Sequence, residues 1–88
     1  YGRLHREYLK QEHPAWYSSL ILTGKLWTYL ADLNEQAEER LDLIIEQMKA
    51  TEGVTEELKA RNQLEWVGRM NNIRNRAEEI IKSELIYI

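Results

Sequence analysis

The stretch WVGRMNNIRNRAEEI, residues 66–80, contains the side chains of this sequence that are best suited to contact a nucleic acid. Arginines and asparagines alternate there with apolar residues that recur every three or four positions. Guanidinium groups bind phosphates, and carboxamide groups form hydrogen bonds to base edges. The candidate contacts to a nucleic acid or to a protein partner are Arg69, Asn71, Asn72, Arg74, Asn75 and Arg76.

A second interpretation places the same arginines on the outer surface of a packed helix. Glu65 precedes Arg69 by four residues and Glu79 follows Arg76 by three, spacings at which side chains meet on a helix. An acidic partner helix is expected to offer further carboxylates at the same height, from Asp32, Glu35, Glu38 and Glu39. Exposed pairs of this kind contribute only about 0–1 kcal/mol each. Because they remove the need for an external anion, we favour this interpretation over nucleic acid contact.

The charge balance differs from that of a typical DNA-binding module, which is strongly basic. The 88 residues carry a net charge of −3. Residues 1–25 contribute +2, residues 26–55 contribute −5 and residues 56–88 contribute 0. Only a local basic patch is compatible with this balance.

Length and composition predict one small domain without covalent or metal staples. The sequence contains no cysteine, so a reducing compartment is compatible. Its longest purely apolar runs, residues 20–22 and 43–45, are far too short for a membrane span or a signal peptide. We therefore expect a cytoplasmic protein with no membrane association. The chain begins at Tyr1 rather than methionine, so we expect further sequence to precede it.

Residue patterns that support catalysis are sparse. His5 and His13 are the only histidines, and no Glu-x-x-His or His-Glu-x-x-His spacing is present. Ser18 and Ser19 lack the flanking glycines of a nucleophile elbow, and there is no glycine-rich phosphate loop. We expect no catalytic residue, metal, cofactor or small-molecule ligand, and predict that the protein is not an enzyme.

Proline and glycine divide the N-terminal part into short helices, over about residues 2–23. Pro14 suits the first turn of a helix, and the residue before a proline avoids helical dihedral angles, so a boundary is predicted at His13. Gly24 either ends the second short helix or lies inside one longer helix at a cost of about 1 kcal/mol. We favour a break or kink there.

Two longer helices are predicted over about residues 25–52 and 55–86, because apolar residues recur along both at helical spacing. Between them, Gly53 suits the end of one helix and Thr55 the N-cap of the next, and this short turn makes the helices antiparallel. The predicted layers pair Leu41 with Trp66, Ala37 with Met70, Leu33 with Ile73, Leu30 with Ala77 and Leu26 with Ile80. The fold class is therefore all-α: a long antiparallel helical hairpin with one or two shorter N-terminal helices packed on it. This three- to four-helix bundle forms a single domain of residues 1–88.

A further set of residues suits a protein interface. On the last helix, a leucine and a glycine lie opposite the apolar stripe, and the glycine permits close approach of another backbone. Several aromatic residues lie near Gly24, where they either stack on bases or seal a core or an interface, and we favour the second role. The candidate interface residues are Leu64, Gly68, Trp16, Tyr17 and Trp27.

Four segments of the sequence resemble TnpV, a family of small proteins encoded on bacterial transposons. They are YGRLHREYLK at residues 1–10, LTGKL at 22–26, GVTEELKARNQLEWVGRMNNIRNRAEEI at 53–80 and ELIY at 84–87. The resemblance spans nearly the whole chain. It implies the bacterial cytoplasm and an accessory task in the life of a mobile element, but it brings no catalytic or binding residues with it.

Two functions follow as hypotheses. The first is a non-catalytic accessory protein of a bacterial transposon that acts through helix-mediated contacts, either by self-association or with another protein of the element. The alternative is a small DNA-binding factor that assists excision or transposition, or regulates genes of the element. In the second hypothesis, the polar residues between 69 and 76 contact DNA, and Arg3, Arg6 and Lys10 form a second basic patch.

Overall fold

The computed structural model describes residues 1–87, and every regular element in that part of the chain is helical. The all-α class predicted from the sequence is confirmed. In chain order the elements are α1 (Gly2–Glu12), α2 (Pro14–Leu22), α3 (Leu26–Glu52), α4 (Glu56–Arg61), α5 (Gln63–Ile81) and the single π-helical turn η1 (Lys82–Ile86). The molecule is elongated, with extents of 55 × 19 × 18 Å.

The two N-terminal helices meet at His13, and Pro14 begins α2 as predicted. The break favoured at Gly24 is also present, because this residue has a φ of +71° in the left-handed region and separates α2 from α3. α1 buries His5 and Leu9 against neighbouring elements. α2 has no buried residue. Only one of the two short helices is therefore packed into the core.

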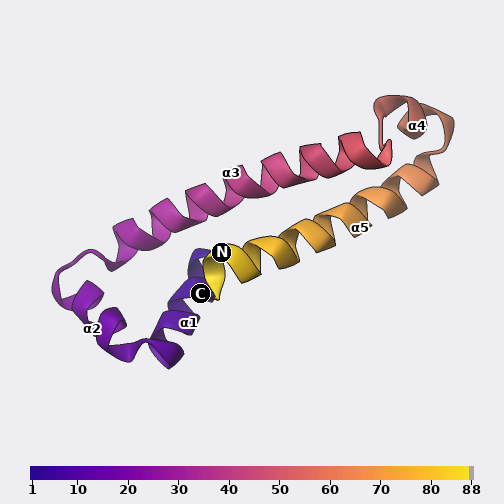
Figure 1. The fold of residues 1–88 in the computed structure, drawn as a ribbon. Coiled ribbons are helices and arrows are strands. Elements are labelled where there is room, and N and C mark those ends of the chain that lie inside the picture. Colours follow the sequence, from indigo (N-terminus) through magenta and orange to yellow (C-terminus); the bar gives the residue numbers. More distant parts are fainter. Residues whose placement is uncertain (88) are drawn as a thin grey trace.

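α3 and α5 run side by side in opposite directions, with α4 at one end of the pair and α1 and α2 at the other (Figure 1). α3 ends at Gly53, whose φ of +69° is again left-handed. The main core lies where α3, α4, α5 and η1 meet. Its fully buried members include Ala37, Ile73, Ala77 and Ile81. Apolar residues at helical spacing on α3 and α5 therefore do face the core, as the periodicity indicates.

The prediction of one continuous helix over residues 55–86 is wrong. The chain breaks at Asn62, which ends α4 and begins α5, and its Oδ1 accepts a hydrogen bond from the Glu65 backbone N–H at 3.2 Å. Thr55 caps α4 as predicted, with its Oγ1 accepting from the Leu58 N–H at 3.2 Å. Asn62 suits this break because asparagine side chains compete with the helical backbone for hydrogen bonds and are favoured at helix N-caps. Since Leu58 is buried, the short α4 folds back onto the core.

The predicted layers between the two long helices are also wrong. Arg76 of α5 forms an ion pair with Glu52, the last residue of α3. In the predicted register, Arg76 lies level with residues 30–31, roughly 30 Å from Glu52 along the helix axis. No pair of side chains bridges that distance. The register differs because residues 53–62 form the α4 segment rather than a tight turn. Trp66, predicted in the core opposite Leu41, is only half-buried and lies beside Lys59 of α4, with the Nζ 4.7 Å from the ring centre.

Candidate interaction surfaces

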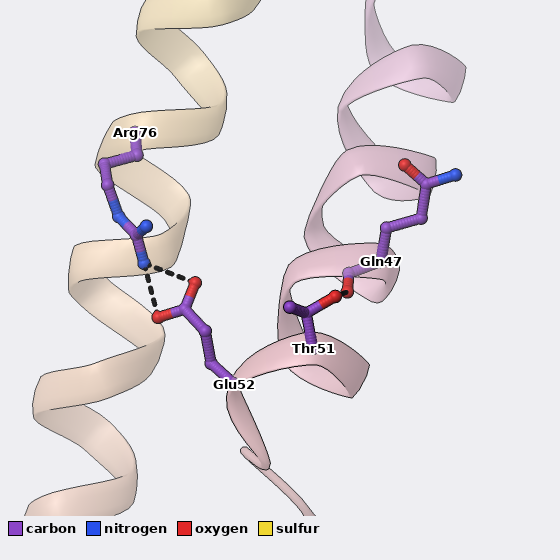
Figure 2. Close-up of polar contacts among 4 residues, drawn as sticks. All are labelled: Gln47, Thr51, Glu52 and Arg76. Atoms are coloured by element: carbon purple, nitrogen blue, oxygen red, sulfur yellow. Dashed lines mark hydrogen bonds and ion pairs between the residues drawn. The ribbon is translucent and has the colours of Figure 1, made fainter.

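The polar cluster predicted to contact a nucleic acid or a partner lies on α5, and all six of its side chains are exposed. Two of its arginines are held by carboxylates. Arg69 Nη2 lies 2.8 Å from Glu65 Oε1, one turn earlier on the same helix. Arg76 Nη2 donates to both carboxylate oxygens of Glu52 at 2.7 Å each (Figure 2). At these two positions the cluster therefore lies on the outer surface of a packed helix, with its arginines paired to carboxylates.

The ion pair formed by Arg76 differs from the predicted one. The sequence suggested either Glu79, three residues later on the same helix, or a carboxylate near the start of the acidic helix, from Asp32, Glu35, Glu38 or Glu39. The structure instead uses Glu52 at its end, and Figure 2 shows this carboxylate reaching from α3 toward α5. Directly before Glu52, Thr51 Oγ1 donates to the carbonyl oxygen of Gln47, one turn earlier on α3, at 2.9 Å. Of these polar side chains, Glu52 is therefore the one that joins α3 to α5.

Arg74 occupies a different environment from the other two arginines. Burial and the charges of Glu78 and Glu38 raise the pKa of the Tyr1 phenol, whereas the charge of Arg74 lowers it. The charge of Arg74 is therefore felt at the Tyr1 phenol, unlike the charges of the two paired arginines. No carboxylate oxygen within residues 1–87 approaches the Arg74 guanidinium to 4.0 Å.

The predicted interface residues separate into two surfaces at opposite ends of the molecule. Leu64 and Gly68 lie on α5 near α4, where Leu64 is 86 % exposed and a side chain at Gly68 would meet open space. Trp16, Tyr17 and Trp27 lie at the end formed by α1, α2 and the start of α3. The structure therefore does not join the five residues into one interface.

The apolar residues at the N-terminal end form a surface that we call the α2 patch. It consists of Trp16, Ile21 and Leu22 of α2 with Trp27 of α3, and its members are 46 %, 50 %, 86 % and 68 % exposed. Trp16 stands against Tyr29, with ring centres 5.5 Å apart. Exposed apolar side chains scattered singly are ordinary, but their concentration at one end of this molecule makes that end a candidate contact surface.

Two open hollows line the long helix α3. The larger, of about 620 Å³, lies between α1 and α3, and we call it the Arg–Trp hollow. Its lining residues are Tyr1, Gly2, Arg3, Arg6, Trp27, Leu30, Ala31 and Asn34. The smaller, of about 380 Å³, lies between α3 and α5, with Ile44, Met48 and Ile80 among its lining residues and the Arg76–Glu52 pair at its edge. Sequence reasoning grouped Arg3 with Arg6 but missed both hollows, because they depend on how helices pack.

His5 is the functional group that sequence reasoning most clearly missed. It is fully buried, and its ring joins three elements: Nδ1 lies 2.8 Å from the Ile86 carbonyl oxygen, and Nε2 lies 2.8 Å from the Tyr29 hydroxyl. Because a carbonyl oxygen only accepts, Nδ1 carries the proton, and in the neutral ring Nε2 accepts from Tyr29. Burial raises the pKa of Tyr29. The spacing of His5 and Leu9, four residues apart on α1, was the available indication of a shared buried face.

Residues 1–87 bring no three histidine, cysteine, aspartate or glutamate side chains together in an arrangement that could hold a metal ion. None of the helices in this part combines the length and the apolar character that crossing a bilayer requires.

Comparison with known proteins gave one match. The family model described as "Transposon-encoded protein TnpV" matches residues 1–86. Neither the curated proteins nor the solved structures include a significant match.

Proposed function

This chain belongs to the TnpV family of transposon-encoded proteins, and we propose that it is a non-catalytic accessory protein of a bacterial transposon that acts through protein contacts. Its first partner in this proposal is a second copy of the same chain, joined through the α2 patch. The site of action is the cytoplasm. The observation that carries the proposal is α2 itself, an apolar helix in which no residue is buried.

The α2 patch lacks the features that usually keep a surface helix in water. The segment from Pro14 to Gly24 contains no charged residue, in a chain where 31 % of residues are charged. Surface helices of monomeric proteins normally carry charges on the face away from the core. Here both faces are apolar or neutral, and leucine, isoleucine and tryptophan side chains remain accessible. Covering them removes apolar surface from water, which is favourable.

A second copy is the partner that this surface fits best. In a two-fold pair each subunit presents the same patch, so like charges meet wherever the patch is charged. An uncharged helix avoids that repulsion. Trp16 and Trp27 together leave roughly 250–300 Å² exposed. With Ile21, Leu22 and the surrounding atoms, two copies would bury on the order of 1,000 Å², the size at which specific interfaces begin.

Direct DNA contact through α5 has less support. Arg69 and Arg76 each hold a carboxylate, so contact with a phosphate requires them to exchange one anion for another. Arg74 and the three asparagines remain exposed, and they are the residues that would contact DNA in this alternative. A factor that assists excision or transposition through these residues would lose salt-dependent DNA binding when Arg74 is replaced by alanine.

Sedimentation equilibrium with a matched pair of variants tests the proposal. Leu22 and Leu64 are both 86 % exposed but lie at opposite ends of the molecule, so Leu22→Glu and Leu64→Glu introduce the same charge at different surfaces. We expect the unmodified chain to form dimers at tens of micromolar, Leu22→Glu to be monomeric and Leu64→Glu to remain dimeric. A monomeric unmodified chain overturns self-association. Dissociation by Leu64→Glu alone moves the interface to α5.

A further inference from the structure

The Arg–Trp hollow between α1 and α3 is lined by two arginines that form no ion pair within residues 1–87. Arg3 and Arg6 both line it, and Lys10 follows on the same side of α1. Within residues 1–87, no carboxylate oxygen lies within 4.0 Å of any of these three groups. Five other basic side chains of the described chain do form such pairs: Arg40, Lys49, Arg69, Arg76 and Lys82. Other basic side chains, Arg74 among them, are also unpaired in this part of the chain, but Arg3 and Arg6 are the ones that line a hollow together.

Arg6 is held in a position that suits an incoming anion. Its guanidinium carbon lies 5.5 Å from the centre of the Trp27 ring, a cation–π arrangement that fixes the side chain. Its Nε is buried and has no hydrogen-bond partner within the described residues. A buried donor without a partner is costly, and the guanidinium fork matches phosphate oxygens in a bidentate geometry. An anion that enters the hollow and shifts the Arg6 side chain outward would supply the missing acceptor.

The rest of the hollow suits a planar, mostly apolar group. Trp27 is 68 % exposed, and Arg6 lies over one part of its ring. Leu30 and Ala31 add apolar lining, and Asn34 adds a carboxamide. A base stacked on an exposed aromatic ring is a common feature of single-strand binding, and carboxamides pair with base edges. The volume of about 620 Å³ lies within the range of small-molecule sites.

We propose that the Arg–Trp hollow binds a nucleotide unit, with its phosphate on Arg3 and Arg6 and its base against Trp27. The unit is either a free nucleotide or one residue of a single-stranded nucleic acid, since both present the same phosphate and base. A duplex does not fit this mode, because its bases are stacked on one another and not free to meet Trp27. Because Trp27 also belongs to the α2 patch, dimerisation through that patch and nucleotide binding compete for this side chain. The inference places nucleic acid contact on α1 and α3 rather than on α5.

The test is fluorescence anisotropy of a labelled oligothymidylate with the full chain, at about 50 and 200 mM salt. Thymidine monophosphate and a blunt duplex serve as competitors. Arg6→Ala is compared with Arg61→Ala, which removes the same charge from α4 at the far end. We expect saturable binding that weakens at least tenfold in Arg6→Ala and less than twofold in Arg61→Ala. Tighter competition by the monophosphate than by unlabelled strand identifies a free nucleotide as the ligand, and the reverse identifies a strand.

Two variants separate recognition from folding. Arg6→Lys keeps the charge but removes the guanidinium fork, so we expect an intermediate loss of affinity with an unchanged circular dichroism spectrum. Trp27→Leu keeps an apolar side chain but removes the stacking surface, and we expect a loss of at least fivefold. No saturable binding of either ligand up to about 1 mM overturns the proposal, since a weaker site has little specific affinity. Equal losses in Arg6→Ala and Arg61→Ala also overturn it, because they indicate unspecific attraction to charge.

Discussion

Arg76 of α5 and Glu52 at the end of α3 form a two-point contact, with Nη2 2.7 Å from each carboxylate oxygen. The pair joins residues 24 positions apart and marks how far α5 lies along α3. We expect Glu52→Gln and Arg76→Gln to show a coupling energy of about 0.5–1 kcal/mol in a double-mutant cycle, because both side chains are partly exposed. Urea unfolding of the four proteins measures this value. Zero coupling would mean that the pair does not persist in solution.

The salt dependence of this coupling provides a second check. The pair formed by Glu65 and Arg69 on a single helix serves as the control, since it does not join two helices. Both couplings should fall in about 1 M salt, where exposed charges are screened over about 3 Å. Only the pair formed by Glu52 and Arg76 joins α3 to α5. A coupling between Glu52 and Arg76 that does not fall in about 1 M salt would contradict an exposed ion pair.

The hydrogen bond from Tyr29 to His5 supports the packing of α1 on α3. Tyr29→Phe removes the donor and leaves His5 Nε2 buried without a partner, at a cost of about 1–3 kcal/mol. Tyr17→Phe is the matched control, because it removes a hydroxyl from a half-buried tyrosine of α2 and should change the free energy of unfolding by less than about 0.5 kcal/mol. Urea unfolding compares the two variants. Equal stabilities of the two variants would argue against the His5 contact.

Stability should fall in alkaline solution in a way that depends on Tyr29. Burial raises the pKa of this phenol above its ordinary value of 10.0, so the folded state retains the phenolic proton better than the unfolded state does. The resulting stabilisation is fully present below about pH 10 and is lost as the pH rises through the folded-state pKa. Thermal unfolding between about pH 8 and 11 should show a smaller alkaline decline in Tyr29→Phe than in Tyr17→Phe. Identical declines would contradict this origin.

The glycines of the chain should respond to alanine in opposite directions. Gly24 and Gly53 have φ near +70°, where a Cβ is strained although space is free, so each replacement should destabilise the fold by about 1 kcal/mol or more. Gly68 lies inside α5, also with open space, so Gly68→Ala should stabilise it by about 0.5–1 kcal/mol. Thermal unfolding measures all three. A destabilising Gly68→Ala would indicate that another chain approaches this position closely.

Some contacts of the candidate sites follow from residue spacing along one helix, and others depend on how the helices pack. Arg69 and its glutamate lie four residues apart, so their ion pair could be predicted from spacing alone. The partner of Arg76 could not, because it depends on the register of two helices. The sequence predicts an interface role for Trp27 from its aromatic neighbours, and that role stays a prediction. Its position beside Arg6 was not predicted, because α1 and α3 meet only in the folded chain.

The sequence by itself determined the helical class, the boundaries at Pro14, Gly24 and Gly53, and which side of each long helix is apolar. These features depend on dihedral preferences, caps and helical periodicity, which act over a few residues. Only the tertiary structure decided the break at Asn62, the register of α3 against α5, the burial of His5 and the Arg–Trp hollow. A periodic apolar stripe packs against another at several registers one or more turns apart, with similar burial in each. The folding of residues 53–62 into α4 selects one of them.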